Sequence, residues 1–270
     1  MTSAHSDDPL DGVGVLVTRP EHQAEALCAQ VAQAGGIPVR FPAIAIEAPS
    51  DPDAAAAVID TLERFDLAIF ISANAVERGV AAVRARRSWP AGLATASIGA
   101  ATARALDAHG LAPEVQPEGR FDSESLLAHP ALADVRGRRV VIFRGEGGRE
   151  TLAETLRARG AEVVYAEVYR RMRPQADPAP LIARWRAGGV GVVVATSVEG
   201  VRNLWALLGP EGRPLLRTTP LVVSSARVLQ QALELGCGGP IRVADASSDQ
   251  ALCEAVVAWR RADTAAREQQ

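Results

Sequence analysis

The sequence predicts an α/β protein with two domains, each built on a doubly wound parallel sheet covered by helices. The chain has 270 residues and is 48% hydrophobic, which is enough for two cores because domains usually contain about 100–200 residues. Short apolar runs alternate with amphipathic helical patterns, as is typical of parallel strands that are buried on both faces. The chain also contains an internal repeat, so two similar domains are expected.

The first repeated block pairs residues 12–46 with residues 137–171 without a gap. Each copy reads as a strand, a turn containing an arginine, an amphipathic helix, a glycine and a second strand. Gly35 and Gly160 are expected to end the two helices, since glycine adopts the left-handed conformation found after many helices. The buried face of the first helix is expected to contain Ala24, Leu27, Cys28 and Val31.

The second repeated block pairs residues 66–132 with residues 191–259. Each copy begins with an apolar strand that ends in serine, and a helix follows. A second strand then leads into small polar residues and another helix, and a third strand leads into a polar turn and a last helix. The segments Asp122–Glu124 and Ser247–Asp249 are expected to cap these last helices, because serine and aspartate accept hydrogen bonds from a helix N-terminus.

Small polar residues follow the strands at matching places in both copies of this block. Ligands of doubly wound sheets bind beyond the carboxyl ends of the strands, where helix N-termini offer N–H groups to anions. For a single serine the alternative is a helix cap alone, but two equivalent sets favour a shared binding cleft. The residues are Ser72, Ala73, Asn74, Gly99, Thr196, Ser197, Ser224 and Ser225.

The composition excludes several kinds of chemistry. All 29 basic residues are arginines, so Schiff-base enzymes and P-loop nucleotide sites, which need lysine, are excluded. The four histidines lack metal-site spacing, and no GxSxG hydrolase motif occurs. The turn Gly145–Gly148 lacks the dinucleotide spacing and is interpreted as a flexible turn or a ligand-contacting loop. We expect neither a metal nor a cofactor.

Location and partners are also constrained. Aromatic residues are few and no basic patch interleaves with them, so nucleic-acid binding is not expected. No apolar stretch is long enough for a membrane helix or a secretion signal, which favours the cytoplasm. Cys28, Cys237 and Cys253 show no paired spacing and are interpreted as reduced thiols. These residues alone predict a protein that binds a large polar or anionic molecule, without naming it.

The sequences of five motifs resemble those of one protein family. VLVTRP, DLAIFISANAV, SIGAATARAL, VVIFRGEGGRETLAETLRARGAEV and EVYRR occur in this order within residues 13–260 and are similar to uroporphyrinogen-III synthases. The resemblance implies two flavodoxin-like domains, joined by a two-stranded antiparallel linker, in which the first block of each copy pairs with the second block of the other. The implied boundaries are a first domain of 12–37 plus 175–262, linker strands at 38–47 and 163–174, a second domain of 50–162, and disordered tails at 1–11 and 263–270.

The resemblance also implies a reaction. Members of the family take hydroxymethylbilane, a linear tetrapyrrole with eight carboxylates, remove water, invert ring D through a spiro intermediate and close the macrocycle without a cofactor. The substrate ionises readily, so the main task of the enzyme is to position it. A monomeric enzyme in transient contact with hydroxymethylbilane synthase is implied.

The implied catalytic residue is Tyr169 of EVYRR, which would help the hydroxyl group to leave; the alternative is a linker tyrosine that only packs. The sequence departs from the family at Ile71 and at Arg227–Val228, where threonines often stand. Arginines in turns suit carboxylates. The implied substrate contacts are Ser72, Thr102 and Ser197, then Ser123, Thr196, Ser224 and Ser225, with the turn arginines Arg19 and Arg144.

Two alternatives remain open from the sequence. One is a transferase or epimerase that acts on another anionic metabolite, although it would need a nucleotide contact that is not evident. The other is a non-catalytic tetrapyrrole-binding or regulatory relative of the same fold.

Overall fold

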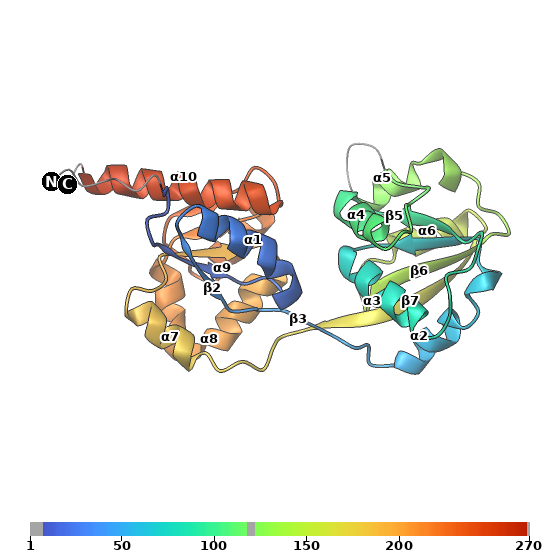
Figure 1. Ribbon diagram of the computed structural model, residues 1–270, viewed down its shortest axis with the longest axis horizontal. Coiled ribbons are helices and arrows are strands. Elements are labelled where there is room, and N and C mark those ends of the chain that lie inside the picture. Colours follow the sequence, from blue (N-terminus) through green and yellow to red (C-terminus); the bar gives the residue numbers. More distant parts are fainter. Residues whose placement is uncertain (1–7, 118–121, 269–270) are drawn as a thin grey trace. The chain divides into compact units, whose positions relative to one another are not determined.

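The computed structural model describes residues 8–117 and 122–268 and divides into two compact units (Figure 1). Unit 1 is formed by both ends of the chain, Met1–Ala45 and Met172–Gln270, and unit 2 is formed by Ile46–Arg171. Each unit consists of a sheet with helices on both faces, as predicted from the alternation of strand and helix patterns.

The sheet of unit 1 has five strands in the order β10-β9-β8-β1-β2, and all neighbouring pairs are parallel. Its central strand has the sequence VVVA and is buried throughout, because helices cover both faces. The strands are β1 (Gly14–Val17), β2 (Ile37–Arg40), β8 (Val192–Ala195), β9 (Leu221–Val223) and β10 (Ile241–Val243).

Alternate residues of these strands pack into two separate cores. Val15 and Val17 contact the helices at one face, whereas Leu16 packs with the helices of the other. The first face is covered by α1 (Glu21–Gln33) and α10 (Asp249–Glu268), and the second by α7 (Ala179–Arg186), α8 (Val198–Thr218) and α9 (Ala226–Glu234). Helix α1 buries Ala24, Leu27, Cys28 and Val31, as its spacing predicts.

The second sheet has the order β3-β7-β6-β4-β5. The pairs β4–β5, β4–β6 and β6–β7 are parallel, and Val115 extends the far edge through a parallel bridge to Ala96. The strands are β3 (Ala45–Glu47), β4 (Leu67–Phe70), β5 (Ala94–Ser97), β6 (Arg139–Gly145) and β7 (Glu162–Met172).

Helices also cover both faces of this second sheet. One face carries α2 (Pro52–Ile59), α3 (Ala73–Arg84) and α4 (Ala100–Ala108), and the other carries α5 (Ser123–Leu127) and α6 (Thr151–Ala158). The short 3-10 helices are η1 (Leu62–Arg64) and η2 (Pro130–Leu132). Stacked Phe70 and Phe143, with ring centroids 4.6 Å apart, centre the core under α3.

The two sheets repeat the same order of strands. Strands β1 and β2 of unit 1 correspond to β6 and β7 of unit 2, and β8 and β9 correspond to β4 and β5. The bridge at Val115 takes the place of β10. Each sheet therefore combines the first block of one copy with the second block of the other, so long-range pairing of distant chain segments builds both units.

Details of the expected boundaries differ from the structure. Residues 38–40 belong to β2, which pairs in parallel with β1, so this part of the expected linker strand is an edge strand of unit 1. Helix α10 continues through 263–268, where a disordered tail was expected, because Asp263 forms ion pairs with Arg260 and Arg267 one turn away. Leu10, in the other expected tail, is fully buried. Residues 1–7 and 269–270 of those tails lie outside the described residues.

The predicted helix ends are present. The Asp122 carboxylate accepts a hydrogen bond from the Ser125 N–H at 2.8 Å and caps α5, while the Ser248 hydroxyl accepts one from the Ala251 N–H at 3.2 Å near the start of α10. Gly35 and Gly160 follow α1 and α6 with φ of +78° and +90°. Local chemistry therefore sets where these helices stop and start.

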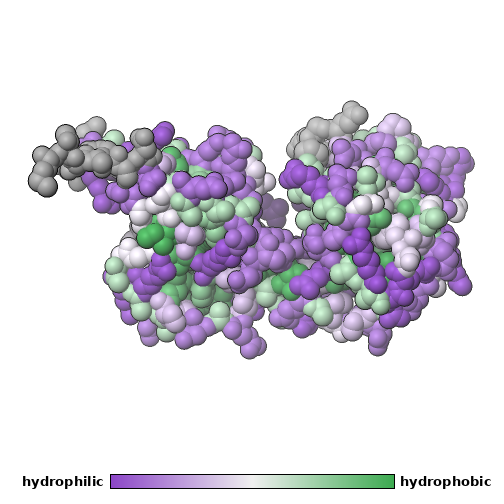
Figure 2. Space-filling view, viewed as in Figure 1, coloured by the Kyte–Doolittle hydropathy of each residue, from purple (hydrophilic) through white to green (hydrophobic). Residues whose placement is uncertain are grey.

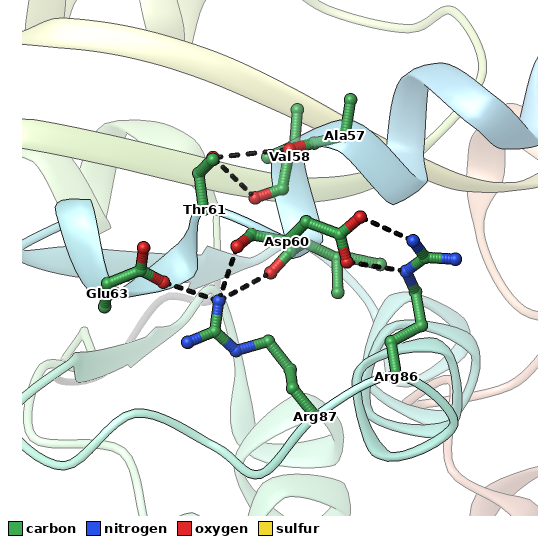
Figure 3. A network of polar contacts seen from close by, with 8 residues as sticks. Ala57, Val58, Asp60, Thr61, Glu63, Arg86 and Arg87 are labelled. Atoms are coloured by element: carbon green, nitrogen blue, oxygen red, sulfur yellow. Dashed lines mark hydrogen bonds and ion pairs between the residues drawn. The ribbon is translucent and has the colours of Figure 1, made fainter.

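A network of ion pairs ties the end of α2 to the end of α3 in unit 2 (Figure 3). The Arg86 guanidinium donates to both carboxylate oxygens of Asp60, and Arg87 donates to Glu63 and to the Asp60 carbonyl oxygen. Arginine holds the pKa of the Asp60 carboxyl below its usual range, chiefly through the hydrogen bond from Arg86. The network lies beside η1, just before β4 begins, at the edge of the sheet opposite the carboxyl ends of the strands.

The surface of each unit is mostly hydrophilic on the face seen in Figure 2, with scattered apolar residues. Within residues 8–117 and 122–268, no helix is long and apolar enough to cross a membrane. The three cysteines are buried and unpaired.

Candidate active site

Two of the predicted site residues, Ser72 and Tyr169, meet in unit 2. Strand β4 ends at Phe70, and Ser72 then caps α3 in an extended conformation, its hydroxyl accepting a hydrogen bond from the Ala75 N–H at 3.0 Å. The phenolic oxygen of Tyr169 lies 3.1 Å from the same hydroxyl. Tyr169 is only 2% exposed, while Ser72 and Ala73 beside it are partly exposed. The phenol is thus held at a helix N-terminus at the carboxyl edge of the sheet.

A β-bulge in β7 directs Tyr169 to this place. Residues of a strand alternate between faces, and Val164 and Ala166 accordingly face the α3 side while Tyr165 faces the other. The register then shifts, so that Glu167 pairs with Arg144 whereas Tyr169 pairs with Gly145. Val168 is the extra residue, and both it and Tyr169 pack in the core under α3. Without the bulge, regular alternation would point the phenol to the opposite face.

Gly145 makes room for the tyrosine ring. A Cβ atom at this position would lie 2.6 Å from the nearest ring carbon of Tyr169, well inside van der Waals contact. The Glu146 N–H also donates to the Tyr169 carbonyl oxygen at 2.9 Å. From the sequence this glycine is predicted only as part of a turn, because Tyr169 is distant along the chain.

The N-terminus of α4 lies next to that of α3. Their strands are adjacent, and the Ile98 N–H donates to the Phe70 carbonyl oxygen at 3.2 Å. Gly99 is the N-cap residue of α4 and has no side chain to fill the position. The first N–H groups of a helix have no carbonyl acceptor in a preceding turn, so a helix N-terminus is a place where anions can bind. Thr102, in the first turn, is 3% exposed.

Unit 1 has an equivalent edge. The Ser197 hydroxyl caps α8 by accepting from the Gly200 N–H at 2.9 Å, and the Ser224 hydroxyl donates to the Thr196 carbonyl oxygen at 2.9 Å. Ser225 is the N-cap residue of α9, yet its hydroxyl makes no cap hydrogen bond. The structure therefore brings Thr196, Ser197, Ser224 and Ser225 to the ends of the adjacent strands β8 and β9.

The two predicted arginines are bonded to groups of their own units. Arg19 forms an ion pair with Asp249 and donates to the Ser247 carbonyl oxygen at 3.0 Å, which ties the end of β1 to the start of α10. Arg144, at the repeated position, is 2% exposed and pairs with Glu150 at 2.9 Å. Its guanidinium also donates to the carbonyl oxygens of Gly145 and Gly147. These contacts, which the sequence alone could not show, hold the strand-to-helix loops.

The surroundings of Arg144 perturb two further groups. Its carbon Cζ lies 4.5 Å from the ring centroid of Tyr165, and the Tyr165 hydroxyl donates to Glu150. Burial and the hydrogen bond to Glu150 raise the pKa of Tyr165. The hydrogen bonds from Tyr165 and Arg144 lower the pKa of Glu150, which therefore stays charged and keeps the loop closed on the arginine.

The chemistry of the two edges differs. In the gapless repeat, Ile44 of unit 1 stands where unit 2 has Tyr169, and Ser197 stands where unit 2 has Ser72. Ile44 lies close to Gly200 in the first turn of α8. A serine cap is therefore present in both units, whereas the phenol is confined to unit 2. Ser123, at the start of α5, is partly exposed and is not hydrogen-bonded to these residues within the part of the chain that the structure describes.

Comparison with known proteins identifies relatives over most of the chain. The family described as uroporphyrinogen-III synthase HemD matches residues 25–254. The chain is 38% identical to a uroporphyrinogen-III synthase of Salmonella typhimurium over 247 residues, which cover 90% of this chain and 100% of the relative. It is 36% identical to the Escherichia coli enzyme of the same name, with the same coverage.

Solved structures agree in fold. A mutant uroporphyrinogen III synthase from the extremely thermophilic bacterium Thermus thermophilus superposes with a TM-score of 0.57 at 23% identity, covering 94% of this chain and 99% of the other. A uroporphyrinogen-III synthetase from Helicobacter pylori gives a TM-score of 0.58 at 14% identity, covering 92% and 99% of the two chains.

Proposed function

The chain belongs to the uroporphyrinogen-III synthase family, whose members are enzymes of heme biosynthesis, and from this premise we propose that it converts hydroxymethylbilane into uroporphyrinogen III. The reaction removes one water, inverts ring D through a spiro intermediate and closes the ring. The observation that supports a catalytic role most directly is the phenol of Tyr169, held 3.1 Å from the Ser72 hydroxyl at the N-terminus of α3.

Tyr169 acts as the general acid. Its phenolic proton passes to the hydroxyl of the substrate's hydroxymethyl group while the carbon–oxygen bond breaks, so water leaves and an azafulvene cation remains. The ring D carbon that already carries the methylene bridge attacks this cation and forms the spiro intermediate. The bond from that carbon to the bridge to ring C then breaks and leaves a second azafulvene cation, which the free pyrrole carbon of the inverted ring D attacks. The proton that this carbon loses restores the phenol. The positive end of the α3 dipole stabilises the phenolate in the interval.

The helix N-termini bind substrate carboxylates. The N–H groups at Ala73 and Asn74, at Gly99, and at the starts of α8 and α9 are donors of the kind that anions occupy. The hydroxyls of Thr102, Ser123, Thr196, Ser197 and Ser225 supply further donors, and the Ser224 hydroxyl, which donates to the Thr196 carbonyl oxygen, holds this edge in place. The isolated azafulvene can also close without inversion of ring D. These contacts therefore favour the type III product by holding the linear tetrapyrrole in one folded arrangement.

Arg19 and Arg144 support the site from inside the protein. Each is paired with a carboxylate of its own unit, Asp249 or Glu150. An arginine that already has its carboxylate offers little to a second one, so their role is to fix the loops after β1 and β6.

The enzyme works without a metal or a cofactor, as a monomer in the cytoplasm, and receives its labile substrate from hydroxymethylbilane synthase in a transient contact. The donor set at the site, which consists of hydroxyls, a phenol and backbone N–H groups, suits an anionic organic substrate and offers no metal ligand of high affinity.

A coupled assay tests the function. Hydroxymethylbilane is generated in situ by its synthase, the purified protein is added after treatment with a chelator, and the oxidised products are separated into type I and type III uroporphyrin. Type III must predominate if the proposal holds. Type I alone, the product of closure without enzyme, would contradict it and would point to the non-catalytic relative.

A further inference from the structure

We propose that Ser72 is a positioning residue: its hydroxyl donates its proton to the phenolic oxygen of Tyr169, so that the proton of Tyr169 itself points to the substrate. This inference rests on the proposed function, in which Tyr169 is the acid. It assigns Ser72 a role distinct from binding a carboxylate.

The cap hydrogen bond fixes one side of the Ser72 oxygen. A serine hydroxyl has one proton and two acceptor sites, and one acceptor site is taken by the Ala75 N–H at 3.0 Å. That N–H belongs to the first turn of α3, where the helix dipole is positive. Accepting a hydrogen bond from this turn polarises the serine O–H and makes it a better donor, since hydrogen bonds in a chain strengthen one another. Its proton is therefore directed to Tyr169, 3.1 Å away.

The environment of the phenol allows little else. Tyr169 is 2% exposed, and Ser72 is the hydrogen-bond partner of its oxygen in the described part of the chain. Gly145 and the bulge at Val168 leave the ring in one orientation. If Tyr169 donated to Ser72 instead, its proton would be spent inside the protein, so the direction of this one hydrogen bond decides whether the acid is available.

Unit 1 provides an internal comparison. Ser197 caps α8 as Ser72 caps α3, but Ile44 occupies the repeated position of Tyr169. The serine cap is therefore common to both units, whereas the contact between a serine and a phenol occurs in unit 2, which contains the proposed acid Tyr169. Capping and positioning are two separable functions of the same hydroxyl.

Three substitutions separate these functions. Ser72→Thr keeps both the cap and the donor. Ser72→Asn and Ser72→Asp have closely similar shapes and both cap a helix well, but the amide can donate to Tyr169, whereas the carboxylate can only accept and so draws the phenolic proton away from the substrate. Thermal unfolding verifies that all three variants are folded. Arg86→Gln, which lies away from the site, serves as the control for effects of substitution and purification on activity.

The expected result is a change in kcat rather than in KM alone. Ser72→Thr should retain kcat within about threefold and Ser72→Asp should lower it by about tenfold or more, with Ser72→Asn between them, since general acid catalysis contributes about 10²–10⁴-fold. The chain has two tyrosines, so ¹³C labelling of the phenolic carbon gives two NMR signals, and Tyr169→Phe identifies one of them. That signal should move in Ser72→Asp and stay near its original position in Ser72→Thr.

Two outcomes would overturn the inference. In the first, Ser72→Asp has the same thermal unfolding temperature as the wild type, keeps kcat and raises only KM. Ser72 would then bind substrate or only cap the helix. If the Tyr169 signal is the same in the Asp, Asn and Thr variants, the direction of the hydrogen bond is not set by Ser72. The proposed function fails by a different observation, namely type I uroporphyrin alone in the coupled assay with the wild type, so the two failures are distinguishable.

Discussion

The hydroxyl groups of Ser72 and Tyr169 lie 3.1 Å apart although 97 residues separate them in the sequence. One residue caps a helix and the other lies near the end of a long strand, and the order of strands in the second sheet brings them together. The contact places the Tyr169 phenol, which can donate a proton, at the carboxyl edge of the sheet, where α/β proteins bind ligands.

Removing the phenolic hydroxyl should reduce turnover without unfolding the protein. Tyr169→Phe loses one hydrogen bond, worth about 0.5–1.5 kcal/mol, and keeps the buried ring. We expect kcat to fall by about 10²-fold, at the lower end of general acid catalysis, while KM changes little. Steady-state kinetics and thermal unfolding measure the two effects, and a loss confined to KM would contradict the role as an acid.

Adding one methyl group at Gly145 should displace Tyr169. The new Cβ atom would lie 2.6 Å from a ring carbon, so Gly145→Ala should cost about 1–3 kcal/mol of stability, as overpacked cores do, and should lower kcat because the phenol moves. Gly238→Ala is the matched control, because a Cβ there meets its nearest atom at 3.9 Å and the backbone is not in the left-handed region. Equal kinetics for the two variants would contradict the assignment.

The two serines of unit 1 should respond differently to truncation. Ser197→Ala removes the cap of α8, so it should lower the free energy of unfolding by about 0.5–2 kcal/mol and also raise KM. Ser225 makes no cap bond, so Ser225→Ala should raise KM with little loss of stability. Urea unfolding and KM for both variants check this contrast. A large destabilisation by Ser225→Ala with unchanged KM would contradict it.

Acid should weaken the network in Figure 3. The folded pKa of Asp60 lies below its ordinary value because Arg86 donates to it, so this pair stabilises the fold above the ordinary carboxyl pKa, and the contribution disappears as the pH falls through the lowered folded value. Arg86→Gln should therefore be less stable than the wild type near neutral pH, and the difference should shrink as the pH falls. Unfolding by urea between about pH 7 and pH 3, which spans ordinary carboxyl pKa values, tests this.

Arg86→Gln should leave kcat and KM unchanged, because the network lies beside η1 and the C-terminal end of α3, away from Ser72. A difference in stability that grows toward acid would contradict the interpretation.

The sequence predicted what depends on local patterns. The apolar face of α1, the cap at Asp122 and the glycine stops at Gly35 and Gly160 follow from residue spacing and backbone chemistry. The two parallel α/β sheets follow from the alternation of strand and helix patterns, which the repeat reinforced.

What the sequence could not predict depends on contacts across the chain. The bulge that turns Tyr169 toward α3 arises from the pairing of β7 with β6, and no residue in EVYRR signals it. The partners of Arg19 and Arg144, Asp249 and Glu150, are known only when the loops are in place. Residues 38–40 were expected in a linker strand, and only their parallel pairing with β1 shows that they belong to the sheet of unit 1.

The most direct test of the account is the ratio of type III to type I uroporphyrin formed from hydroxymethylbilane by the wild type and by Tyr169→Phe, at equal protein concentration. We expect the wild type to yield mainly type III, and Tyr169→Phe to form it so slowly that type I from uncatalysed closure dominates. If the wild type yields type I alone, or if Tyr169→Phe produces type III as fast as the wild type, the account of Tyr169 as the acid of a uroporphyrinogen-III synthase reaction is wrong.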